Sequence, residues 1–127
     1  MALTRMILAA VLLLAGCDDD GGGKAPKVGE AMTPFSARSL AGDTVELPRA
    51  AAGKVLVLRF WATWCAFCKD EMKAIEPVWR ARRDDGLLVL AVNAGQSADA
   101  IAKFVADLGV SYPVLLDPGS RIARGYG

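Results

Sequence analysis

The feature that most constrains the fold is an apolar strand that leads directly into a pair of cysteines. Residues 54–60 contain four consecutive apolar residues, Val55 to Leu58, and Cys65 and Cys68 follow shortly after them. A continuous apolar run is typical of a strand buried on both faces, so we expect this strand at the centre of a sheet. If the chain turns helical at Cys65, the two sulfurs face each other across one turn, at a separation that suits a disulfide.

The spacing of the two cysteines predicts reversible thiol chemistry. A thiol in the first turn of a helix lies beside unpaired backbone N–H groups and the positive end of the helix dipole, and both stabilise the thiolate. We therefore predict that Cys65 is the nucleophile. Cys68 is predicted to be the resolving cysteine, which attacks the mixed disulfide formed with a substrate. Trp64 and Phe67 are expected to form an apolar rim near the sulfurs.

Two other uses of a Cys-x-x-Cys pair fit the composition less well. A zinc site needs four ligands, but the chain contains no histidine and only one further cysteine, Cys17. A purely structural disulfide across so short a loop constrains the unfolded chain little, so stability is a poor reason for one. We expect no metal and no other cofactor.

The first residues of the chain have the pattern of a signal peptide. Arg5 precedes an apolar run from Met6 to Ala15, which is too short to span a bilayer as a helix. The ending Leu14-Ala15-Gly16-Cys17 resembles bacterial lipoprotein precursors, in which the cysteine is lipidated and the preceding peptide is removed. We predict a signal peptide over residues 1–16, lipidation of Cys17, and a flexible lipid-anchored tether over residues 17–27. The alternative is an uncleaved membrane anchor.

The residue after Cys17 and the charge balance bear on location and partners. Asp18 resembles the signal that keeps lipoproteins in the inner membrane of enteric bacteria, so we expect the protein on the periplasmic side of the inner membrane. Cleavage before Cys17 removes Arg5, which turns 15 basic and 14 acidic side chains into 14 of each. This balance predicts no nucleic-acid surface.

Residues 28–127 have the pattern of one α/β domain. Turn-forming residues between two short extended segments predict an N-terminal β-hairpin. Strand and helix patterns then alternate, which predicts a central mixed sheet whose parallel strands are covered by helices, with the cysteines at the carboxyl end of a strand. The expected strands are a hairpin from 35–37 and 44–47, followed by strands over 54–60, 87–92 and 114–116. The first expected helix covers 65–83, with a kink or break near Lys73 to Pro77. The second runs from Ser97 to Leu108 and ends at Gly109.

These segments resemble the TlpA/ResA-type membrane-anchored thioredoxin-like proteins of the thioredoxin and AhpC-TSA superfamily. The resemblance covers residues 28–127, and the segment Gly53 to Met72 carries its most specific part, supported by Val92-Asn93-Ala94-Gly95 and Tyr112 to Asp117. It implies a thioredoxin fold and thiol-disulfide oxidoreductase activity. It also implies that Cys65 is exposed and Cys68 more buried.

The chain departs from these relatives at several positions. Phe67 stands where many relatives have proline, Gln96 where some carry a glutamate that tunes the cysteines, and Lys73 where a helix-kinking proline is common. Relatives also continue, after a segment like residues 120–127, into a cis-proline loop, a hairpin and a final helix. The resemblance therefore predicts a C-terminally truncated domain with an open sheet edge and low stability.

The resemblance implies a periplasmic protein that exchanges its dithiol for disulfides in client proteins, as a reductant of the cytochrome c maturation type. A membrane thiol reductant of the DsbD/CcdA kind would restore the dithiol. One alternative is a peroxiredoxin-like thiol peroxidase, although Leu58 replaces the proline of that motif and a tryptophan precedes Cys65. Another is a copper-binding assembly factor whose two thiolates hold Cu(I), which would need further ligands.

Overall fold

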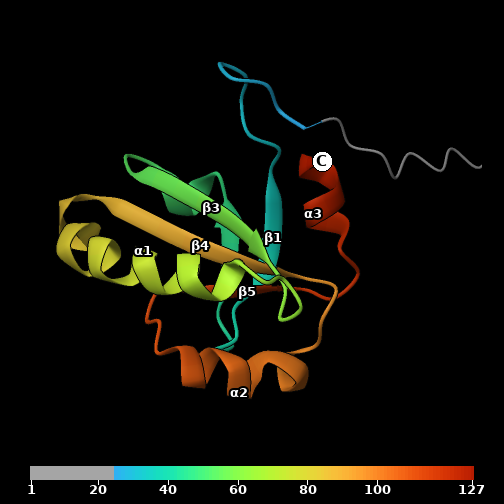
Figure 1. Ribbon diagram of the computed structural model, residues 1–127. Helices are drawn as coiled ribbons and strands as arrows, with labels where there is room; N and C mark the ends of the chain where they lie inside the picture. Colours follow the sequence, from blue (N-terminus) through green and yellow to red (C-terminus); the bar gives the residue numbers. More distant parts are fainter. Residues whose placement is uncertain (1–24) are drawn as a thin grey trace, which may run out of the picture.

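The computed structural model describes residues 25–127. The predicted signal peptide, the predicted lipidation site Cys17 and most of the predicted tether lie outside these residues. No helix within residues 25–127 combines the length and apolar character needed to cross a membrane. The elements, shown in Figure 1, are β1 (Phe35–Arg38), β2 (Thr44–Leu47), η1 (Arg49–Ala51), β3 (Val55–Trp61), α1 (Cys68–Arg82), η2 (Arg83–Asp85), β4 (Leu87–Ala94), α2 (Ala98–Leu108), β5 (Val114–Asp117) and α3 (Arg121–Tyr126).

The strands form a parallel sheet and an antiparallel hairpin that touch at β5. β3, β4 and β5 are parallel in that order, with Val55 opposite Leu87 and Ala91 opposite Val114. β1 and β2 pair antiparallel, as the sequence predicts. An antiparallel bridge between Ser39 and Leu115 joins the hairpin to β5. The expected α/β fold and N-terminal hairpin are therefore confirmed, with the parallel strands in one sheet and the hairpin joined to it by a single bridge.

β4 divides the hydrophobic core into two layers. Because side chains alternate between the faces of a strand, Val89 and Ala91 pack under α1 and α2. Leu90 and Val92 pack on the other side, against the hairpin and α3. All four side chains are buried, and each large apolar side chain buried in this way stabilises the fold by about 1.5–3 kcal/mol. β4 is therefore the strand that its apolar run predicts, covered on both faces.

The prediction for β3 is wrong in one respect, because β3 lies at the edge of the three-stranded sheet and β4 occupies the centre. Val55 and Val57 are 69% and 37% exposed on the face that α1 covers farther along the sheet. In Figure 1, α1 lies along β4, so the beginning of β3 extends past this cover. An apolar run indicates low polarity, but it carries no information on how many neighbours a strand has.

The helices differ from the sequence predictions mainly at their ends. α1 begins at Cys68 rather than at Cys65, and it continues through Pro77 as one helix, so the chain does not break there and only the kink stays a prediction. On this helix Val78 is exposed, whereas Met72 is fully buried. α2 is as predicted, since Ser97 Oγ accepts a hydrogen bond from Ala100 N and Gly109 ends the helix with a φ of 73°.

α3 has no counterpart in the sequence predictions. It is one short segment near the chain end, and contacts from distant residues hold it in place. The carboxylate of Asp117 accepts a hydrogen bond from Ala123 N at 2.9 Å. Tyr126 donates its hydroxyl hydrogen to Thr33 O at 2.7 Å, and its ring lies 5.4 Å from that of Phe60. Thr33 and Phe60 are far from Tyr126 in the sequence, so no local pattern could indicate these two contacts.

Candidate active site

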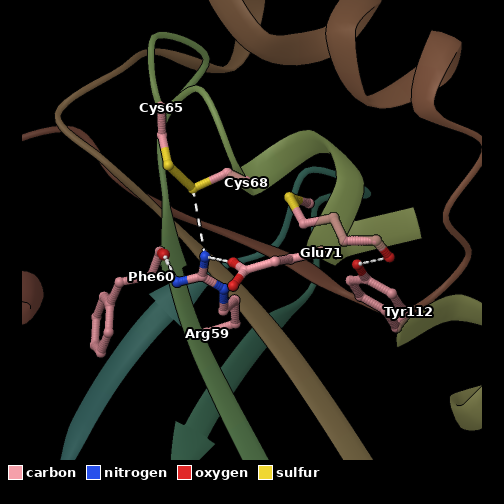
Figure 2. Close-up of polar contacts among 7 residues, drawn as sticks. Arg59, Phe60, Cys65, Cys68, Glu71 and Tyr112 are labelled. Atoms are coloured by element: carbon pink, nitrogen blue, oxygen red, sulfur yellow. Dashed lines mark hydrogen bonds and ion pairs between the residues drawn. A yellow bond between two sulfur atoms is a disulfide. The ribbon is translucent and has the colours of Figure 1, made fainter. Parts of the chain in front are cut away.

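The two cysteines form a disulfide at the carboxyl end of β3, in the turn that leads into α1 (Figure 2). Their Cα atoms are 5.4 Å apart. Cys65 N donates to Ala62 O and Cys68 N donates to Cys65 O, which closes the turn. Cys68 is 2% exposed and Cys65 is partly exposed. A reagent or substrate can thus approach the Cys65 sulfur more readily than the Cys68 sulfur.

The helix that follows the cysteines begins later than the sequence predicts. Because α1 begins at Cys68, Cys65 lies before the first helical turn, and Phe67 occupies the cap position without a side-chain hydrogen bond. The positive end of a helix dipole acts over its first turn. Cys68 therefore lies in the first turn, and Cys65 lies just outside the positive end of the helix. The predicted roles of Cys65 as nucleophile and Cys68 as resolving cysteine stay predictions.

Hydrogen bonds of Gln96 connect the loop before the cysteines to the end of β4. Its Oε1 accepts hydrogen bonds from Thr63 N at 2.9 Å and from Asn93 Nδ2 at 3.0 Å, and its Nε2 donates to Thr63 Oγ1 at 2.7 Å. A neutral amide can both donate and accept in this way. The sequence identified Gln96 only as a neutral replacement, and its contact with Thr63 depends on the parallel packing of β3 and β4.

The predicted rim residues are highly exposed. Trp64 and Phe67 are 80% and 78% exposed, on either side of Cys65 in the sequence. Trp61, by contrast, is buried and stacks on Phe104 of α2 at 5.4 Å. A shallow hollow of about 230 Å³, lined by both cysteines, Trp64 and neighbouring residues, lies beside the disulfide. A larger hollow of about 430 Å³ is lined by other residues, between the hairpin and α2.

Arg59 is a site residue that the sequence predictions missed. Its Nη2 donates to Cys68 Sγ at 3.5 Å, and the same guanidinium forms an ion pair with Glu71 of α1 (Figure 2). Its Nη1 donates to Phe60 O at 2.8 Å. A signal was available, because Arg59 stands two residues before Trp61 and must share its face of β3. That face is the one covered by α1, where Cys68 lies.

The candidate site offers two cysteine sulfurs as soft ligands. Within residues 25–127, no three side chains of His, Cys, Asp or Glu gather in a group that could hold a metal ion. The two cysteine sulfurs are bonded to each other. The chemistry that this arrangement supports directly is the opening and closing of the disulfide.

Fold and site together define a thioredoxin-like protein with a Cys-x-x-Cys disulfide at the end of a β-strand. Residues 28–127 match the AhpC/TSA family, and the chain belongs to this family. The family resemblance and the thioredoxin-like fold expected from the sequence are therefore confirmed.

Several similar proteins are named as enzymes of thiol-disulfide exchange. The chain is 33% identical over 101 residues to the thiol-disulfide oxidoreductase ResA of Halalkalibacterium halodurans, which covers 80% of this chain and 57% of that protein. A candidate protein disulfide isomerase from Bacteroides thetaiotaomicron has a similar structure, with a TM-score of 0.75, 31% identity, and coverage of 80% of this chain and 65% of that one. A secreted disulfide oxidoreductase of Mycobacterium tuberculosis, homologous to E. coli DsbE, gives a TM-score of 0.61 and 27% identity, covering 71% and 66%. The chain thus spans little more than half the length of the ResA relative.

Proposed function

We propose that this protein is a thiol-disulfide oxidoreductase that exchanges the Cys65–Cys68 dithiol for disulfides in client proteins. The observation that carries the proposal is the disulfide itself, with one partly exposed and one buried sulfur in the turn between β3 and α1. The names of the similar proteins support the same activity. Two exposed aromatic side chains beside the disulfide offer an apolar surface to a client polypeptide.

The exchange proceeds in two balanced steps. In the reduced protein, the Cys65 thiolate attacks one sulfur of the client disulfide, and the other client sulfur leaves with the electron pair and takes up a proton. The Cys68 thiolate then attacks Cys65 Sγ, which forms the Cys65–Cys68 bond and breaks the bond to the client. The client leaves as a dithiol and the protein as a disulfide, so two electrons pass to the client.

We assign the direction and the partners by analogy. An oxidising compartment already has dedicated oxidants, so a tethered thioredoxin-like protein is more useful there as a specific reductant, of the cytochrome c maturation type. A membrane thiol reductant of the DsbD/CcdA kind would return the protein to its dithiol state. The ending Leu14-Ala15-Gly16-Cys17 supports a lipid anchor at Cys17 and a place on the periplasmic side of the inner membrane.

Trapping of the mixed disulfide tests the proposal. Cys68→Ser removes the resolving thiol, so Cys65 is expected to stay covalently bound to a disulfide-containing protein such as insulin. Mass spectrometry should find this adduct, and dithiothreitol should release it. The matched variant Cys65→Ser should form far less of it. Equal adduct formation by the two variants would overturn the assignment of Cys65 as the nucleophile.

A further inference from the structure

Cys68 faces an energetic obstacle in the resolving step, because only a thiolate attacks a disulfide efficiently. The side chain is 2% exposed and packs among apolar residues of the core layer under α1 and α2. Burial in apolar surroundings disfavours the charged form of a thiol. The first turn of α1 offers this sulfur only the partial positive charge of the helix dipole, and a nearby group with a full positive charge would stabilise the thiolate further.

The guanidinium of Arg59 lies in the position that such a group would need. Arg59 Nη2 donates to Cys68 Sγ at 3.5 Å. The side chain is 31% exposed, so solvent screens its charge only in part. Two further contacts, to Phe60 O at 2.8 Å and to the Glu71 carboxylate, fix the plane of the guanidinium. Arginine holds such multiple contacts better than lysine, because its donors form a rigid planar fork.

Other ionisable groups around this sulfur do not replace Arg59. Glu71, on α1, is negative and 55% exposed. Its ion pair with Arg59 orients the guanidinium and offsets part of its charge. Lys69 and Asp70 follow Cys68 on α1 but are exposed. Tyr112, which precedes β5, donates its hydroxyl hydrogen to Met72 O. Burial and the charge of Glu76 raise the pKa of Tyr112 to about 12, although the charge of Arg59 acts in the opposite direction. Tyr112 is therefore neutral at working pH. Within residues 25–127, Arg59 is the one charged side chain that hydrogen-bonds to either sulfur.

We propose that Arg59 stabilises the Cys68 thiolate and thereby speeds the resolving step. This inference rests on the proposed function for its biological meaning. In the mixed disulfide, the Cys68 thiol releases its proton to solvent and its thiolate is held by the Arg59 guanidinium. The thiolate then attacks Cys65 Sγ, and the client sulfur leaves with the electron pair and takes up a proton.

The pH dependence of Cys68 alkylation tests this proposal directly. In a Cys65→Ser background, the rate of iodoacetamide modification at Cys68 is followed against pH by mass spectrometry of the Cys68 peptide. The midpoint of the profile is the readout, because burial slows the reagent at every pH. Arg59→Gln should raise this midpoint by roughly one pH unit or more, as expected for the loss of an opposite charge within about 4–6 Å. Arg59→Lys should raise the midpoint less than Arg59→Gln does, because lysine keeps the positive charge.

A second Arg–Glu pair provides the matched control. Arg49 forms an ion pair with Glu46 at 2.8 Å, just before the amino end of β3 and thus at the end of the strand opposite the cysteines. Arg49→Gln removes the same charge and should leave the midpoint unchanged. If Arg59→Gln loses the native circular dichroism spectrum, Arg59→Met, which keeps an apolar stem, gives the same comparison. A midpoint in the charge-removing variant equal to that of the parent would overturn the proposal.

The lifetime of the mixed disulfide gives a kinetic readout that a purely structural role would not reproduce. At neutral pH, Arg59→Gln should prolong this lifetime about threefold to fourfold, because about tenfold less thiolate is offset in part by the greater nucleophilicity of a more basic thiolate. The difference should shrink as the pH rises and Cys68 ionises without help. A lifetime difference that does not vary with pH would contradict the proposal. The alkylation titration uses no client protein, so its outcome is independent of whether the proposed oxidoreductase activity is found.

Discussion

Trp64 and Phe67 place two large apolar surfaces beside the partly exposed sulfur of Cys65. Neither side chain contributes to the core, since both are about four-fifths exposed. Aromatic side chains in such positions commonly carry much of the binding energy of a protein interface. We therefore expect these two residues to recognise client polypeptides, while the sulfurs carry out the chemistry.

Substitution of the rim residues should separate recognition from chemistry. Trp64→Ala and Phe67→Ala should each raise KM for a protein substrate about fivefold to tenfold, which corresponds to a loss of about 1 kcal/mol of binding. Turnover of a small disulfide such as oxidised glutathione should change little. The control is Val78→Ala, which changes an exposed apolar side chain on α1. Equal losses for the protein and the small substrate would argue against a recognition role.

Among the helices and strands, those with signals in their own sequence could be predicted. Ser97 and Gly109 mark the two ends of α2, and the uninterrupted apolar run of β4 indicates its burial. The edge position of β3 could not be predicted, because it depends on strand order. The contact of Arg59 with Cys68 joins β3 to α1, and the sequence indicates only that Arg59 shares a strand face with Trp61, not which side chain it meets there. The Cys-x-x-Cys pair was recognised because its chemistry depends on local spacing alone.

Two glycines with positive φ allow a prediction about the turn after β4. Gly95 has a φ of 81°, and a Cβ added there would lie 2.9 Å from Ser120 Oγ. Gly109 has a φ of 73°, but a Cβ there would meet nothing within 4 Å. Both Gly→Ala changes should cost about 1–2 kcal/mol of unfolding free energy from backbone strain, and Gly95→Ala should cost more.

The excess cost at Gly95 has a specific origin that can be removed. In a Ser120→Gly background, the cost of Gly95→Ala should fall to that of Gly109→Ala, as measured by urea unfolding. An equal cost at Gly95 in both backgrounds would show that the contact with Ser120 does not restrict this position.

The contact between α1 and the segment before β5 should make stability depend on pH. Glu76 accepts hydrogen bonds from Ser111 N at 2.8 Å, from Ser111 Oγ and from Arg80 Nε. Burial by itself raises the pKa of Glu76, but these hydrogen bonds outweigh it and hold the pKa below the ordinary value of 4.5. A carboxyl group with a lowered pKa stabilises the fold above its ordinary pKa, and this contribution is lost as the pH falls through the folded-state pKa.

Glu76→Gln should therefore destabilise the protein at neutral pH and matter little in acid. We expect a loss of about 1–2 kcal/mol at neutral pH, measured by urea unfolding, since the amide keeps only part of the hydrogen bonding. Glu46→Gln, which removes an exposed ion-pair partner, should change stability by less than about 1 kcal/mol. A Glu76→Gln effect that grows on acidification would contradict the direction of the pKa shift.

The whole molecule combines the thioredoxin-like domain with a predicted membrane attachment at its N-terminal end. Cys17 lies outside the described residues, and the lipid anchor stays a prediction from the Leu-Ala-Gly-Cys pattern. Cys17→Ser should move the protein from the membrane fraction to the soluble fraction of cells, because no lipid can be added. Cys68→Ser, which leaves Cys17 in place, should remain with the membrane. Continued membrane association of Cys17→Ser would favour an uncleaved membrane anchor.

The central claim is that the disulfide between Cys65 and Cys68 exchanges with disulfides of other proteins. Its most direct test is the rate of insulin disulfide reduction by the purified protein in the presence of dithiothreitol, with hydrogen peroxide turnover measured beside it. The account predicts that the protein accelerates insulin reduction, that Cys65→Ser abolishes this acceleration, and that peroxide turnover stays at the background rate. Insulin reduction no faster than with dithiothreitol alone, or Cys65-dependent peroxide turnover in its place, would contradict the account.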